Sequence, residues 1–211
     1  MENDERLAYV RNFITYDHEI LHTLDIDAEQ RDDIQPFIER ELAKTLSLLV
    51  RLTGAKRVLE LGSGVGYSTI WIAEAVCRTG GTLVTIDNHP RTSKEAHDHI
   101  EEAGLSDVVE YRFGDVERLL PEMAAKGECY DLIFQDCGKY VYTIVYEEVY
   151  RLLAHGGLLF TDDTLLQFDP SIRKGLGVYM DRYNKRLFAD KRYYSTILPV
   201  GQGICLSLKE K

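Results

Sequence analysis

The sequence of 211 residues has only four cysteines, and none of them forms a CxxC pair. Cys77, Cys129, Cys137 and Cys205 lie far apart, so their spacing predicts neither a disulfide framework nor a zinc knuckle. The chain has no run of 18 apolar residues, and its acidic start lacks the basic and apolar regions of a signal peptide. We therefore expect a cytoplasmic protein with reduced thiols and no membrane span.

Basic residues are also scarce, because 25 lysines and arginines face 35 aspartates and glutamates and leave a formal net charge of −10. Such a chain has no general basic surface for nucleic acid, which disfavours polynucleotide substrates, although a local patch can still bind a structured RNA. With 45% hydrophobic residues, the length predicts one globular domain over residues 1–211.

Two parts of this domain differ in pattern. Residues 1–53 have apolar side chains at helical spacing and predict a helical cap, which covers the sheet or a partner subunit. Residues 54–211 alternate between strand-like and helix-like segments, the pattern of an α/β core. The apolar positions of the cap are Leu7, Val10, Phe13 and Ile14, followed by Leu42, Leu46, Leu49, Val50 and Leu52.

A glycine-rich loop is the strongest signal in the core. The apolar run 58–61 breaks into Gly62, Gly64 and Gly66 and then enters a helix-like segment. Glycine lets a ligand approach the backbone, and the following helix presents free N–H groups. Asp87 ends the next strand-like run about 20 residues later, where nucleoside sites place a carboxylate for the ribose. The pattern therefore predicts a bound nucleoside cofactor.

Acidic residues end two later strand-like runs, 130–136 and 157–163. Because the carboxyl ends of neighbouring parallel strands meet at one edge of a sheet, we expect Asp136, Asp162 and Asp163 to converge. Three carboxylates repel each other unless a cation lies among them, and oxygen ligands suit Mg²⁺, with Mn²⁺ or Ca²⁺ as alternatives.

Four sequence blocks resemble the class I S-adenosylmethionine-dependent, cation-dependent O-methyltransferases of the caffeoyl-CoA and catechol type. They are residues 59–68, 134–139, 156–165 and 198–204. The resemblance implies a Rossmann-like, seven-stranded mixed sheet with helices on both faces, added N-terminal helices and an antiparallel final hairpin within 192–208. Two positions depart from the family, which commonly has Asp-Asn at Asp162-Asp163 and Asp-Ala-Asp-Lys at 136–139.

By this resemblance, the protein moves a methyl group from S-adenosylmethionine to a metal-chelated hydroxyl of a small catechol-like or vicinal-hydroxyl acceptor, and it forms a homodimer. Lys139, beside Asp136, is the expected general base. The expected magnesium ligands are Asp136, Asp162 and Asp163. The expected cofactor-binding residues are Glu60, Gly62, Ser63, Gly64, Gly66, Ser68, Asp87, Asp115 and Val116.

Several alternatives remain open. A related activity is methylation of hydroxyuridine in tRNA, and a non-enzymatic role is that of a nucleoside-binding module. His18, Glu19 and His22 match the HExxH zinc pattern, although no third ligand is evident nearby.

Single residues also have structural interpretations. Asp115 is equally well explained as a helix N-cap, and Lys139 as a solvated lysine in the first turn of a helix. Tyr140, Tyr142 and Tyr146 line a flat substrate or belong to the core.

Overall fold

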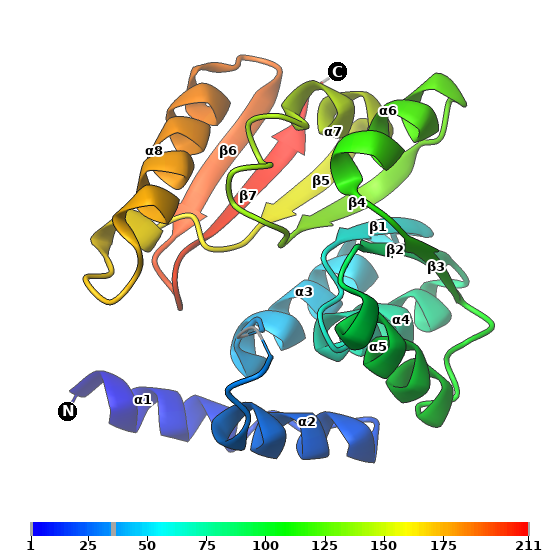
Figure 1. The fold of residues 1–211 in the computed structure, drawn as a ribbon, viewed down its shortest axis with the longest axis vertical. Helices are drawn as coiled ribbons and strands as arrows, with labels where there is room; N and C mark the ends of the chain where they lie inside the picture. Colours follow the sequence, from blue (N-terminus) through cyan, green and yellow to red (C-terminus); the bar gives the residue numbers. More distant parts are fainter. Residues whose placement is uncertain (1, 35–36, 211) are drawn as a thin grey trace.

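A computed structural model describes residues 2–34 and 37–210, which fold around a seven-stranded sheet (Figure 1). The strand order is β3-β2-β1-β4-β5-β7-β6, and β7 runs antiparallel to both of its neighbours while the other pairs are parallel. The predicted mixed sheet with an antiparallel final hairpin is thus confirmed. The strands are β1 (Arg57–Leu61), β2 (Thr82–Asp87), β3 (Val109–Phe113), β4 (Tyr130–Gln135), β5 (Leu153–Thr161), β6 (Tyr193–Leu198) and β7 (Ile204–Lys209).

Helices cover both faces of the sheet because its central strands are apolar on both sides. Val58 packs into the core shared with α3 and α4, whereas its neighbour Leu59 packs into the opposite core shared with α6, α7 and α8. Within the described residues, no helix combines the length and apolar character of a membrane span. The helices are α1 (Glu2–Arg11), α2 (Glu19–Gln30), α3 (Arg40–Thr53), α4 (Tyr67–Thr79), α5 (Pro90–Glu102), α6 (Val116–Ala125), α7 (Tyr146–Leu152) and α8 (Lys174–Ala189), with the short 3-10 helix η1 (Leu166–Phe168).

The chain reverses its direction of winding between β1 and β4, which lie side by side at the centre of the sheet. Figure 1 shows β2 and β3 continuing on one side of this pair, and β5, β7 and β6 on the other. The paired residues Leu61 and Gln135 end the two strands. Ligands of open α/β sheets bind at such a switch point, beyond the carboxyl ends of the strands.

Helix α5 begins at Pro90, because proline suits the first helical position and the His89 side chain accepts a hydrogen bond from Thr92 N. One strand boundary differs from the sequence prediction. The strand expected from residue 157 begins at Leu153, where a register shift between Tyr130 and Leu132 admits the extra pairing.

Candidate active site

The glycine loop after β1 lies directly against the end of β4. Gly62 has a φ of +98°, and a Cβ atom there would lie 2.2 Å from the carbonyl oxygen of Asp136. Gly66 has a φ of +93° and forms the N-cap of α4, and a Cβ atom there would lie 3.2 Å from Cα of Ala96. Only glycine meets both requirements at these positions, and the loop therefore stays open for a ligand at the N-terminus of α4.

Asp87 fastens this loop to the end of β2. The backbone N–H groups of Ser63 and Gly64 each donate a hydrogen bond of 3.0 Å to Oδ2 of Asp87, and His89 N–H donates one of 2.8 Å to Oδ1. The Ser63 hydroxyl also lies 3.0 Å from the hydroxyl of Tyr111 on β3. Asp87, the residue predicted to bind a ribose, therefore lies beside the glycine loop and contacts its backbone.

Glu60 and Ser68 support the loop from inside the protein. Glu60 has no exposed surface, and its carboxylate accepts hydrogen bonds of 2.6 Å from the hydroxyls of Ser68, Thr69 and Thr85. Burial raises the pKa of Glu60 to about 7, although the three hydroxyl donors oppose the shift. These contacts join β1, β2 and the first turn of α4, so Glu60 and Ser68 hold the scaffold of the site.

Asp115 caps α6, since its Oδ1 accepts a hydrogen bond of 3.0 Å from Glu117 N–H. The structural interpretation of this residue is therefore confirmed, and contact with an adenine remains a prediction. The next residue, Val116, is 7% exposed and packs into the core below the sheet edge.

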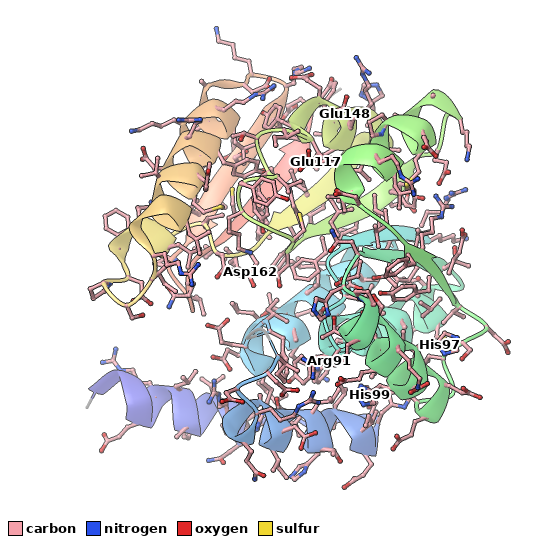
Figure 2. All side chains as sticks on the ribbon, viewed as in Figure 1. Arg91, His97, His99, Glu117, Glu148 and Asp162 are labelled. Carbon is pink, nitrogen blue, oxygen red and sulfur yellow. The ribbon has the colours of Figure 1, made fainter. Side chains whose placement is uncertain are left out.

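A buried cluster of three aspartates and one lysine lies beyond the ends of β4 and β5. Lys139 Nζ is 2.7 Å from Asp136 Oδ1 and 2.8 Å from Asp163 Oδ2, and the lysine side chain is only 10% exposed. Asp162 lies at the carboxyl end of β5 and is 4% exposed (Figure 2). The solvated-lysine interpretation of Lys139 is therefore wrong: Asp136 and Asp163 meet at its ammonium, and Asp162 accepts a hydrogen bond from Asp163 N–H.

The cluster carries more negative than positive charge. Burial alone would lower the pKa of Lys139, but Asp136, Tyr142, Asp163 and Asp162 together raise it well above its usual value, so the side chain is an ammonium. Burial and the facing charges of Asp136 and Asp163 raise the pKa of Asp162 well above its usual range. One ammonium therefore does not balance three carboxylates.

This donor set fits a hard divalent cation in its chemistry, because all its ligand atoms are carboxylate oxygens and its charge is unbalanced. The geometry differs from the prediction in one respect. Among residues 2–34 and 37–210, no three His, Cys, Asp or Glu side chains lie close enough together to hold a metal as they stand. The reason is that the Lys139 ammonium lies between Asp136 and Asp163.

Tyr142 contacts this cluster, a position that differs from the substrate wall considered for it in the sequence. Its buried hydroxyl accepts a hydrogen bond of 3.0 Å from Lys139 Nζ and donates one of 2.9 Å to the carbonyl of Gln135. Residues 139–144 form turns before α7, so helical spacing gave no clue to this position. Of the other two tyrosines considered for a substrate wall, Tyr146 is buried and Tyr140 is 49% exposed.

The HExxH match does not form a zinc site. His18 precedes α2 in an extended conformation, and its Nε2 lies 3.1 Å from a carboxylate oxygen of Glu74. A zinc-binding pair needs both histidines on one helix face, and His18 is outside the helix. His18 therefore serves as a contact between α2 and α4.

Known proteins resemble this chain in both sequence and fold. A family model described as O-methyltransferase matches residues 11–210. The chain is 37% identical over 159 residues to the catechol O-methyltransferase of Niastella koreensis, across 74% of this chain and 72% of that protein. It is 32% identical over 178 residues to caffeoyl-CoA O-methyltransferase 1 of Zea mays, across 79% and 69% of the two chains. The crystal structure of the O-methyltransferase from Bacillus cereus in complex with SAH superposes with a TM-score of 0.85 at 26% identity, over 96% of each chain.

The raised pKa of Glu60 predicts a stability that falls as pH rises. Between its unfolded value of 4.5 and about 7, the folded state holds the proton more tightly than the unfolded state, so the stabilisation is lost with increasing pH. A Glu60→Gln variant has no carboxyl group to titrate at this position, so it does not lose this stability as the pH rises. Relative to the native chain, its free energy of unfolding should therefore rise by about 2 kcal/mol from about pH 5.5 to about pH 7.5.

Urea unfolding at a series of pH values measures this difference. Glu102→Gln removes an exposed carboxylate at the end of α5 and serves as the control, for which no such relative change is expected. Unfolding free energies of native and Glu60→Gln chains that run parallel with pH would show that Glu60 titrates alike in both states.

Proposed function

The chain belongs to the O-methyltransferase family and is an S-adenosylmethionine-dependent enzyme, and on this basis we propose that it methylates a small catechol-like acceptor with the help of a divalent cation. The observation that carries the proposal is the buried cluster of Asp136, Lys139, Asp162 and Asp163 beyond β4 and β5. It lies next to the glycine loop, because Gly62 touches the backbone of Asp136. Methyl donor and acceptor sites are thus adjacent.

The loop and its neighbours fit S-adenosylmethionine, which supplies an activated methyl group on a sulfonium sulfur. The absence of a Cβ at Gly62, together with Ser63, Gly64 and Gly66, lets the methionine part lie close to the backbone. Asp87 lies where it can exchange loop N–H groups for ribose hydroxyls. Asp115 and Val116, at the start of α6, would border the adenine.

Asp136, Asp162 and Asp163 would hold the cation, with Mg²⁺ as the natural choice for carboxylate ligands. Such a cation would acidify a hydroxyl of the acceptor and would lower the pKa of Lys139 by neutralising the carboxylates around it. Asp163 has a φ of +61°, a left-handed conformation that Asp and Asn tolerate better than most residues. The conformation turns successive aspartates of one loop towards the same cluster.

Lys139 would then act as the general base, with Tyr142 holding its Nζ near Gln135 at the end of β4. A lone pair of the acceptor oxygen forms the new bond to the methyl carbon as the sulfur–methyl bond breaks and its electron pair stays on sulfur. The acceptor proton passes to Lys139 Nζ. Charges of opposite sign cancel in this step, which a site shielded from water favours.

The names of two relatives support an acceptor that is methylated on oxygen. One is a catechol O-methyltransferase and another is a caffeoyl-CoA O-methyltransferase, and both names denote O-methylation. A homodimer is also part of the proposal. It is supported by exposed apolar side chains on α3, where Leu48 is 61% and Leu52 75% exposed.

The close approach of Gly62 to Asp136 predicts that Gly62→Ala weakens the binding of S-adenosylmethionine. Its Cβ would lie 2.2 Å from the carbonyl oxygen of Asp136, so the loop must shift away from β4. We expect S-adenosylmethionine to bind at least about tenfold more weakly, measured by isothermal titration calorimetry. Gly54→Ala is the matched control, since Gly54 has a φ of +65° but no atom within 4 Å of the added Cβ. Equal affinities for the two variants would refute this role of the loop.

The proposed chemistry predicts that methyl transfer to catechol requires both a divalent cation and Lys139. EDTA should abolish the transfer, and Lys139→Ala should lower kcat by about 10²-fold or more while S-adenosylmethionine still binds. Product formation is measured by liquid chromatography with Mg²⁺, with EDTA and with each variant. Lys185→Ala, which removes an exposed lysine paired with Asp181, should retain native activity. Activity that survives EDTA or the loss of Lys139 would contradict the mechanism.

A further inference from the structure

A pocket of about 550 Å³ opens between the segment after β5 and the turn that joins β6 to β7. Its lining includes Leu165, Phe168 and Asp169 from the first segment and Gly201 and Gln202 from the second. Leu165 N–H donates a hydrogen bond of 2.7 Å to the carbonyl of Gln202, which fixes the two segments together. The pocket therefore begins two residues beyond Asp163 and is the natural entrance for an acceptor.

The charge of this entrance is negative. None of the residues that line it is a lysine or an arginine, and the one charged member is Asp169. Ser171 donates hydrogen bonds to Asp169 from its backbone and its hydroxyl, and these lower the pKa of the carboxyl, so the side chain is ionised. Gln202 Nε2 also donates to this carboxylate, at 2.7 Å. An anionic group entering here would meet a fixed negative charge.

Glu39 brings a second carboxylate close to the pocket, within the electrostatic influence of Asp163. A Cβ atom on Gly201 would lie 2.5 Å from Glu39 Oε1, which places this carboxylate against the pocket wall. Glu39 precedes α3 but makes no side-chain capping hydrogen bond to it. Burial, Glu41 and Asp163 all act to raise the pKa of Glu39, and the nearby Arg11 is engaged by Glu41 at 3.0 Å.

The Glu39 carboxylate is therefore half-buried and close to other negative charges. Across the part of the chain that the structure describes, no ion pair joins Glu39 to a lysine or arginine. The nearby Arg11 also acts on this charge but is engaged by Glu41, so a further cation would stabilise the half-buried carboxylate. A positively charged group on the acceptor would supply that cation.

We propose that Glu39, with Asp169, makes this enzyme select catechols that carry a cationic amine and disfavour catechols that carry a carboxylate or a coenzyme A phosphate group. The proposal rests on the proposed catechol methylation and names the acceptor class of that same site. Glu39 is a specificity-determining residue here, since its carboxylate lies against Gly201 of the pocket wall while the aspartate cluster carries out the chemistry. Opposite charges about 5 Å apart near a protein surface change binding by roughly tenfold or more, which is enough to sort acceptors.

The test compares kcat/KM for dopamine, 3,4-dihydroxyphenylacetate, unsubstituted catechol and caffeoyl-CoA, all with saturating S-adenosylmethionine and Mg²⁺. We expect dopamine to exceed 3,4-dihydroxyphenylacetate by about tenfold or more, mainly through KM, with a ratio that falls as salt is added. Glu39→Gln should lower this ratio severalfold, with kcat/KM for unsubstituted catechol measured on the same variant as the reference for both charged acceptors. Glu102→Gln, with the same change of charge at the far end of α5, should keep the native ratio.

Metal binding and the pattern of acceptors used together distinguish a failure of the charge selection from a failure of the proposed function. Calorimetry with Mn²⁺ should show at most a severalfold weaker affinity for Glu39→Gln than for the native protein, since the two differ by one nearby charge, and a loss of metal binding would make Glu39 a ligand and overturn the assignment. Equal use of all four acceptors, or a preference for the anionic ones, would overturn the charge selection alone. Transfer to none of them would overturn the proposed function on which the selection rests.

Discussion

Three aspartates share one ammonium in a buried corner of the sheet, and this imbalance of charge governs the site. Lys139 contacts Asp136 and Asp163 at ion-pair distance, while Asp162 is buried with a pKa far above its usual range. Removing carboxylates from water is costly unless positive charge compensates them. The same imbalance that makes the cluster costly makes it receptive to a divalent cation, and a cation would release Lys139 to act as a base.

The fold sustains this arrangement with side chains that hold the neighbouring parts of the site in place. Glu60 ties α4 to β1 and β2 through three hydroxyls, and Asp87 holds the backbone of the glycine loop. Tyr142 links Lys139 to the end of β4. Each of these contacts fixes the position of a group that faces the ligand, so donor and acceptor sites are kept adjacent by rigid elements.

Sequence patterns predicted the sheet well because both faces of its central strands are apolar, and they placed Asp136 and Asp162 at strand ends by the rule for parallel sheets. They did not reveal the support around them. Glu60 was expected to touch the cofactor, but the hydroxyls that bury it come from two other elements. Glu39 was missed because it precedes a cap helix, and the contact of Tyr142 with Lys139 was missed because Tyr142 lies in a turn; only the tertiary fold brings both to the site.

The central claim is that the aspartate cluster binds a divalent cation in place of its internal lysine. A crystal structure of the native chain with SAH and Mn²⁺, with anomalous diffraction recorded, tests it most directly. The account predicts an anomalous peak in contact with Asp136, Asp162 and Asp163, and Lys139 Nζ withdrawn from at least one of its two carboxylates. A structure in which Lys139 keeps both ion pairs and no peak lies among the aspartates would contradict the account.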